Sequence, residues 1–233
     1  MNIVIPMAGN GSRFKEAGYD LPKPLIDING KPMIQLVVEN LNIKEANYIF
    51  LVQSEHYKNY NLDVLLNKIK PNCQIIVIDR VTEGAACTTL MAKKYIDNDI
   101  PLLIANSDQY IEWDSEIFIN DFSKYDAGIV TFKDNHPKWS YAKVDDFGYV
   151  SEVAEKQVIS DQATVGIYYW TNGKEYVKYA LQMIDKDIRV NNEFYVCPVF
   201  NEAILDNKKI IIKEVEKMYG LGTPADLQVF LQK

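Results

Sequence analysis

Glycine and basic residues are concentrated directly after the first apolar run of the chain. The run "NIVIP" leads into "MAGNGSRFKEAGYDLPKPLI", which contains Gly9, Gly11 and Arg13 and then places Lys23 between two prolines. Glycine adopts positive φ at little cost, and backbone N–H groups that turn inward form a concavity for anions. The guanidinium of Arg13 offers a fork of donors that matches phosphate oxygens, and Lys23 adds a second cation. These residue types at this spacing predict a polyphosphate site.

Two better-known phosphate-binding patterns do not fit this stretch. A Walker loop requires GxxxxGK followed by Ser or Thr, and that string is absent. A dinucleotide fingerprint requires a third glycine where this chain has Phe14, and a helix that opens at once. The chain instead runs into "YDLPKPL", which cannot be helical throughout. On the loop alone, the other interpretation is an ordinary glycine turn with Arg and Lys on the surface.

Composition narrows the class of protein. The chain has 233 residues, of which 48% are hydrophobic and 24% charged, as is ordinary for a globular protein. Its net charge of −7 disfavours nucleic acid as a partner, because such binding depends on neutralising phosphates. The apolar runs are strand-sized and no secretory signal is evident, so we expect no membrane partner and a cytoplasmic location. Three scattered cysteines and two histidines favour reduced thiols over a zinc site.

Strand-like and helix-like runs alternate along roughly the first 135 residues. This alternation predicts an α/β protein with a mostly parallel sheet that is covered on both faces. The pattern of the second half of the chain predicts a small lobe on the same sheet, so we expect residues 1–233 to form a single domain. The expected strands are 2–6, 47–53, 74–79, 100–106, 127–132, 163–170 and 209–215, with a hairpin over 141–156 that turns at "DDFG"; the expected helices are 31–41, 57–69, 83–96, 115–122, 173–184, 193–205 and 223–232.

The carboxyl ends of the predicted parallel strands are the expected place for a ligand. In open α/β sheets, ligands bind in the crevice outside those ends. The glycine loop follows the first strand, and "NSDQY", which contains Asp108, follows the fourth. We therefore expect Asp108 to face the same site as the glycine loop.

Motifs along the whole chain resemble those of the nucleotidyltransferases that activate sugar phosphates and related phospho-compounds. "MAGNGSRF" with "PKPLI" resembles the glycine-rich loop and PKPL of that family. "EGAACTTL", "NSDQYI", "EVAEKQ", "VGIYYW" and "GLGTPADL" resemble its later motifs, in the same order. Within the family, "GYDLPKPLI", "NNEFYVCPVFNEAI" and "YGLGTPADL" are most similar to short bacterial capsule and surface-polysaccharide enzymes, among them CTP:phosphoglutamine cytidylyltransferases.

The resemblance implies a Rossmann-like three-layer fold with an acceptor-side lobe, and it implies roles for individual residues. Arg13, Lys23 and Asp108 would be catalytic, and Asp108 would be the ligand of Mg²⁺, a hard cation that prefers oxygen. The nucleotide would be bound by Ala8, Gly9, Asn10, Gly11, Ser12, Arg13, Lys23, Gln53, Glu83, Gly84, Ala85 and Asp108, and the acceptor by Lys156, Gly166, Asn192, Glu193 and Tyr195.

Two positions depart from the family pattern. The proline that normally follows the lysine of the EKP motif is Gln157, and the aspartate that commonly serves as a second metal ligand is Gly220. Asp226 or Glu193 could substitute as a ligand. Asp226, however, stands three residues after Thr223, at the acidic position of an arrangement that resembles a capping box, so it could instead stabilise a helix start. Likewise, Asn192 and Glu193 could be an N-cap and a first-turn acid rather than acceptor ligands.

The expected activity is the Mg²⁺-dependent transfer of CMP from CTP to a small phosphorylated acceptor, phosphorylated L-glutamine, with release of diphosphate. The residues do not specify the base, and a sugar-1-phosphate nucleotidyltransferase that uses CTP, UTP or dTTP is the alternative. A non-catalytic nucleotide-binding regulatory subunit is the alternative from another class. Gly220 favours that second alternative, whereas Arg13, Lys23 and Asp108 argue against it.

Overall fold

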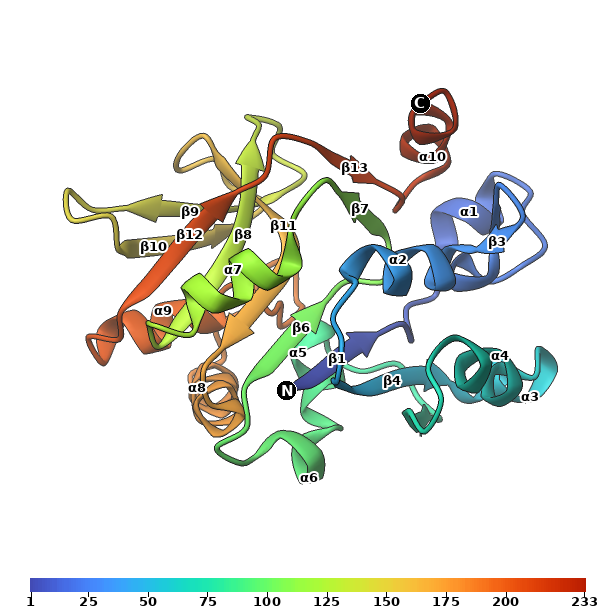
Figure 1. The fold of residues 1–233 in the computed structure, drawn as a ribbon, viewed down its shortest axis with the longest axis horizontal. Helices are drawn as coiled ribbons and strands as arrows, with labels where there is room; N and C mark the ends of the chain where they lie inside the picture. The colour runs from blue at the N-terminus through green and yellow to red at the C-terminus, as the bar shows by residue number, and fades with distance from the viewer.

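The first half of the chain builds the parallel part of a nine-stranded sheet, in a computed structural model that describes residues 1–233 (Figure 1). Strand β1 (Asn2–Pro6) lies between β4 (Asn47–Gln53) and β6 (Leu102–Ala105), and β5 (Gln74–Ile78) lies beyond β4. All three pairings are parallel. The apolar run of β1 is almost completely buried, as expected of a strand covered on both faces.

The second half extends the same sheet with mainly antiparallel strands. Strand β11 (Gln162–Trp170) runs antiparallel to β6 and to β8 (Ala127–Lys133). The hairpin of β9 (Ser140–Val144) and β10 (Val150–Glu155) forms one edge. Strand β12 (Ile210–Glu214) returns parallel to β8. The predicted fold class, with a mostly parallel core and a lobe on the same sheet, is confirmed.

Alternating residues of β1 show how two helical layers cover the sheet. Ile3 and Ile5 belong to one buried cluster, and Val4 belongs to the other, because successive strand residues point to opposite faces. Helices α2 (Met33–Leu41), α4 (Leu62–Ile69) and α7 (Ser115–Phe122) contribute to the cluster of Ile3. Helices α5 (Ala85–Leu90), α8 (Gly173–Asp185) and α9 (Val199–Leu205) contribute to that of Val4. The result is a three-layer molecule.

A third, smaller cluster brings the end of the chain to the glycine loop. Strand β13 (Met218–Gly220) pairs antiparallel with β7 (Gln109–Ile111), which follows β6. Helix α10 (Pro224–Leu231) then packs its Leu227 and Phe230 with Phe14 of α1 (Ser12–Glu16). The short elements around them are the 3-10 turn Lys23–Leu25 and the strands β2 (Asp27–Ile28) and β3 (Lys31–Pro32). The sequence did not predict this arrangement, which closes one side of the site.

Three predicted helices are shorter than expected or are divided. The helix expected over 57–69 is divided into α3 (Ser54–Asn59) and α4, because Asn61 adopts a left-handed conformation with φ 48°. The helix expected over 83–96 is divided into α5 and α6 (Lys93–Ile96), where the N–H groups of Met91 and Ala92 bond three residues back. The helix expected over 193–205 begins only at Val199, immediately after Pro198.

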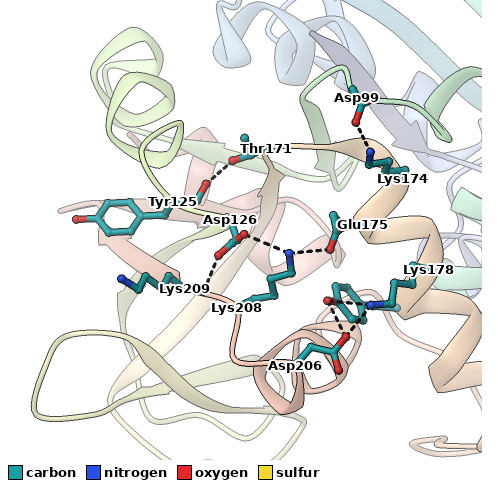
Figure 2. Close-up of polar contacts among 11 residues, drawn as sticks. Asp99, Tyr125, Asp126, Thr171, Lys174, Glu175, Lys178, Asp206, Lys208 and Lys209 are labelled. Atoms are coloured by element: carbon teal, nitrogen blue, oxygen red, sulfur yellow. Dashed lines mark hydrogen bonds and ion pairs between the residues drawn. The ribbon is translucent and has the colours of Figure 1, made fainter.

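Charged side chains join α8 to neighbouring elements at a place remote from the site (Figure 2). The ammonium of Lys208 lies between the carboxylates of Asp126, at 3.4 Å, and Glu175, at 3.1 Å. On the next turn of α8, Lys178 bonds Asp206 at 2.6 Å. These contacts fasten α8 to the start of β8 and to the segment between α9 and β12. No helix of the structure has both the length and the apolar character that crossing a bilayer requires.

Candidate active site

A cavity of about 1010 Å³ opens at the carboxyl ends of β1, β5 and β6. This is the position at which open α/β sheets bind their ligands. The glycine loop enters it from β1, residues 80–85 from β5, and Asp108 from β6, while Lys156 and Gly166 approach from the antiparallel half. The structure thus brings together Ala8, Gly9, Asn10, Arg13, Lys23, Glu83, Gly84, Ala85, Asp108, Lys156, Gly166, Asn192, Glu193 and Tyr195.

Three of the predicted residues do not line the cavity. Gly11 has φ 60°, and its carbonyl accepts from the N–H groups of Phe14 and Lys15, so that α1 starts at Ser12. The side-chain amide of Gln53 donates to the carbonyl of Ala8 at 2.7 Å and to Asn10 Oδ1 at 3.0 Å. We therefore assign Gly11 and Gln53 to support of the loop, whereas Ser12 is an exposed residue at the start of α1.

Lys23 and Asp108 form an ion pair at the centre of the cavity. Lys23 Nζ lies 2.8 Å from Asp108 Oδ2, and both side chains are about three-quarters buried. Arg13 is exposed at the same cavity and takes part in no ion pair. The cationic groups of Arg13 and Lys23 thus line the same cavity as the glycine loop. The carboxylate of Asp108 is paired with the second of them.

The chain passes very close to Asp108 as it returns from β13. The backbone N–H of Leu221 donates to the carbonyl of Asp108 at 2.8 Å. A Cβ on Gly222 would lie 2.8 Å from Asp108 Oδ2, which is closer than real Cβ contacts. Glycine at 222 therefore lets the carboxylate take its present position, a contact that the "GLGTP" pattern alone does not reveal.

Asp108 is the carboxylate at the end of β6 that could offer oxygen ligands to Mg²⁺. Asp108 lies at the strand end with its carboxylate toward the cavity, and no group of three or more His, Cys, Asp or Glu side chains in the chain is arranged to hold a metal. Mg²⁺ commonly keeps several waters and binds through one or two carboxylates together with substrate phosphates. The residues present fit such an ion.

Asp226 performs the capping role that the sequence allowed. The Oγ of Thr223 accepts from the N–H of Asp226 at 3.1 Å and donates to its carboxylate at 2.7 Å. Lys138 adds an ion pair at 3.0 Å. A Cβ on Gly220 would lie 3.6 Å from the Asp226 carboxyl carbon, so this carboxylate occupies the space beside Gly220. It lines the cavity as well as stabilising the start of α10.

The side of the cavity opposite the glycine loop is built from β9, β10, β11 and the segment before α9. Lys156 adopts φ 55°, and its ammonium bonds the Tyr195 hydroxyl at 2.5 Å and lies 4.6 Å from the ring centre. Gly166 has φ 80°, and a Cβ there would lie 2.2 Å from the side-chain nitrogen of Asn106. Gly166 therefore allows a close approach that any other residue would block.

The helical interpretation of Asn192 and Glu193 is wrong. Asn192 has φ 63°, and the backbone groups of Glu193 pair with those of Val190 in a tight bridge. Both side chains are exposed at the cavity, and α9 begins beyond Pro198. Two successive asparagines in left-handed conformations hold the chain in a turn, which is a conformation that asparagine tolerates.

Several cavity residues were not singled out from the sequence. Glu155 is partly buried beside Lys156 and accepts a hydrogen bond from Ser140. Its place directly before Lys156 in "EVAEKQ" was the only available signal. Arg80 and Thr82, which follow β5, carried no recognisable pattern. Asn106 lies in the "NSDQYI" motif, and Lys138, Trp139 and Ser140 lie in "HPKWSYAKV", whose aromatic residues were possible walls of the site.

Burial raises the pKa of the Glu155 carboxyl above its ordinary value of about 4.5. The hydrogen bond from Ser140 and the charge of Lys156 oppose this shift, while Glu193 adds to it. The folded protein therefore disfavours the ionised form of Glu155 relative to the unfolded chain, which costs stability above the unfolded pKa.

We expect Glu155→Gln to raise the thermal midpoint relative to the unmodified protein at neutral pH. The advantage should shrink as the pH falls through the raised pKa of Glu155 in the folded protein, and it should be absent below about 4.5, where Glu155 is protonated in both states. Thermal unfolding of the two proteins between acidic and neutral pH measures the difference. A difference that does not change with pH would show that Glu155 contributes no such titration.

Comparison with known proteins settles the family. The model of the nucleotidyl transferase family matches residues 3–213. This chain belongs to the nucleotidyl transferase family. It is therefore a nucleotidyltransferase, and its cavity at the strand ends is the candidate active site of one.

Relatives of this nucleotidyltransferase include D-glycero-alpha-D-manno-heptose 1-phosphate guanylyltransferase of Campylobacter jejuni, which is 30% identical over 99% of both chains. The bifunctional protein GlmU of Methanocaldococcus jannaschii is 26% identical over 97% of this chain. The chain spans about half the length, or less, of the GlmU proteins that it matches.

Among solved structures, the nucleoside-diphosphate-sugar pyrophosphorylase of Vibrio cholerae superposes with a TM-score of 0.87. It is 23% identical to this nucleotidyltransferase, and the match covers 99% of this chain and all of the other. At that level of identity the likeness concerns the fold.

Proposed function

We propose that this nucleotidyltransferase transfers CMP from CTP to a small phosphorylated acceptor, phosphorylated L-glutamine, and releases diphosphate. The observation that supports this proposal is the charge arrangement of one continuous cavity. Its β1 and β6 side holds Arg13, Lys23 and Asp108, and its far side holds Lys156. Two phosphorylated substrates could therefore meet between them.

The proposed reaction needs no covalent intermediate on the protein. An oxygen of the acceptor phosphate attacks the α-phosphorus of the triphosphate, and the bond from that phosphorus to the β-phosphate bridging oxygen breaks. Diphosphate leaves with the bonding electrons. The attacking oxygen is already anionic, so a general base is not required. The work of the protein is positioning and charge neutralisation.

Each charged residue has a distinct part in this proposal. Arg13 and Lys23 bind the triphosphate, and Lys23 exchanges its contact with Asp108 for a phosphate oxygen when the nucleotide enters. Asp108 is the residue that would hold Mg²⁺, which would neutralise phosphate charge when bound. Lys156 binds the acceptor phosphate and is held in place by the Tyr195 hydroxyl.

The carboxylates near Lys156 support an acceptor that carries hydrogen-bond donors as well as a phosphate. Glu193 is exposed at the cavity, and Glu155 is partly buried at its wall. The ammonium of a phosphorylated amino acid would satisfy them, and so would the hydroxyls of a sugar phosphate. A sugar-1-phosphate acceptor is the second candidate, because the Campylobacter jejuni guanylyltransferase matches this chain over its full length.

A substrate panel tests the proposal. The four nucleoside triphosphates and dTTP are each incubated with Mg²⁺ and with phosphorylated L-glutamine, heptose 1-phosphate, mannose 1-phosphate or glucosamine 1-phosphate, and diphosphate is measured. We expect release with CTP and phosphorylated L-glutamine, and its loss when EDTA removes the metal. Release only with a sugar 1-phosphate would replace the acceptor in the proposal. No release with any combination would contradict the reaction itself.

A further inference from the structure

Two segments that line opposite ends of the cavity are joined through their main chains. We call residues 82–86 the nucleotide loop and residues 187–195 the acceptor loop. The N–H of Phe194 donates to the carbonyl of Glu83 at 2.8 Å, and the N–H of Ala86 donates to the carbonyl of Phe194 at 2.9 Å. Phe194 is buried, and its backbone lies so close that a Cβ on Gly84 would be 2.4 Å from its carbonyl oxygen. Neither loop can move far without the other.

Arg189 adds a side-chain connection between the same loops. Its guanidinium lies 2.7 Å from the carboxylate of Glu83 and 4.0 Å from the ring centre of Phe194. It also donates to the carbonyl of Asn192 at 3.3 Å. A second ion pair with Asp187, at 2.5 Å, holds the guanidinium in place from within the acceptor loop. Arginine can make all of these contacts together because its planar group combines several donors with a face that stacks on aromatic rings.

The acceptor loop depends on these contacts for its shape. It contains no helix, its only strand-like feature is the Val190–Glu193 bridge, and its residues Asp187, Asn191 and Asn192 have positive φ. The nucleotide loop, by contrast, leads directly into α5. A change in the conformation of the nucleotide loop is therefore transmitted to the acceptor loop, which has few other restraints. The acceptor loop presents Asn192, Glu193 and Tyr195 to the cavity.

We propose that Arg189 is a positioning residue that couples the nucleotide loop to the acceptor loop, so that a bound nucleoside triphosphate orders the acceptor loop before the acceptor arrives. This inference rests on the proposed function, since it takes the two loops as parts of the two subsites. Coupling of this kind is reciprocal, so a bound acceptor also favours nucleotide binding. Arg189 itself lines neither subsite and touches no reacting group.

Hydrogen–deuterium exchange of the full chain tests the coupling without turnover. Each nucleoside triphosphate is added with Mg²⁺ and without acceptor. In the unmodified protein we expect slower exchange at residues 8–13, in the nucleotide loop and in the acceptor loop. In Arg189→Gln, residues 8–13 and the nucleotide loop should remain protected, while the added protection of residues 187–193 of the acceptor loop, which the main-chain bonds of Phe194 do not hold, is lost. Equal protection of the acceptor loop in both proteins would overturn the inference.

The same experiment separates the inference from the function on which it rests. If no triphosphate protects residues 8–13 or the nucleotide loop in the unmodified protein, the proposed function fails and the inference fails with it. If those residues are protected and the acceptor loop is not, only the inference fails. Lys178→Gln is the matched control, because it removes another ion-paired cation, at a place remote from the cavity (Figure 2). It should leave the whole exchange pattern unchanged.

Kinetics distinguish positioning from general stabilisation. For Arg189→Gln we expect the KM for the acceptor to rise roughly five- to tenfold, the size expected for charge-assisted bonds of a partly exposed pair, with little change in the KM for the nucleotide. Arg189→Lys should recover part of the loss, because it keeps the charge near Glu83. The double variant, Glu83→Gln with Arg189→Gln, should lose less apparent affinity for the acceptor, expressed as a free energy from its KM, than the two single variants lose together. A loss in the double variant equal to the sum of the two single losses would contradict a positioning role. Equal rises in the KM for the acceptor and the KM for the nucleotide would contradict it as well.

Discussion

Asp108→Asn is expected to reduce kcat/KM for diphosphate formation by roughly 10²–10³-fold, the loss typical when a group that stabilises transition-state charge is removed. Asparagine has nearly the same shape, so it can still accept a hydrogen bond from Lys23 and still fits beside Gly222. It lacks the negative charge that would hold Mg²⁺ and orient Lys23. The fold should survive, because both side chains are partly exposed and the backbone bonds of Asp108 are unchanged.

Steady-state kinetics across a range of Mg²⁺ concentrations measure this effect. We expect the Mg²⁺ concentration that gives half-maximal activity to rise along with the loss in kcat/KM. Asp114→Asn provides the matched control, because Asp114 caps α7 from the surface and lies outside the cavity. Turnover by Asp108→Asn at the level of this control would remove Asp108 from both the metal role and the catalytic role.

Gly84→Ala is expected to affect both stability and activity. The new Cβ would lie within 2.4–2.9 Å of the backbone atoms of Phe194, which cannot rotate away as a flexible side chain could. The φ of 130° at Gly84 is also one that L-residues rarely adopt. Overpacking and backbone strain each cost about 1–3 kcal/mol. We therefore expect the free energy of unfolding to fall by about 2–6 kcal/mol. Activity should fall as the two loops separate.

Chemical denaturation and the KM values for both substrates measure the two parts of this effect. Gly148→Ala is the matched control for strain alone, because Gly148 also has positive φ, at 83°, in the hairpin turn, but no atom lies within 4 Å of its Cβ position. We expect a smaller loss of stability there and no change in activity. If the two variants lose the same stability, the close contact with Phe194 has no energetic consequence.

The local features of this protein could be predicted from its sequence. Apolar runs of strand length identified β1, β4, β5, β6 and β8, because a strand buried on both faces needs apolar residues at nearly every position. Turn chemistry identified the β9–β10 hairpin, whose Gly148 N–H bonds the Asp145 carbonyl at 3.0 Å. The phosphate-binding character of the glycine loop was equally local, since it depends on residues that are neighbours in the chain.

The helices show where local patterns stop being sufficient. The apolar spacing over 57–69 and 193–205 fits a helix, but Asn61, with its positive φ, breaks the first, and a turn followed by Pro198 shortens the second. Asparagine is compatible with both helical and left-handed backbone, and its choice depends on what the surrounding chain packs against. The acceptor loop therefore could not be distinguished from the beginning of a helix.

Only the tertiary structure decided which residues meet in the active site. Lys23 and Asp108 are 85 positions apart, and Lys138 and Asp226 are 88 apart, yet each pair is in direct contact. The pairing of β7 with β13 brings Gly222 against Asp108, and the bonds between Glu83 and Phe194 join the two loops. Contacts of this kind depend on the packing of the whole sheet and its helical layers, which no short stretch of sequence encodes. The sequence determined the kinds of groups that the site contains, and the fold determined their distances.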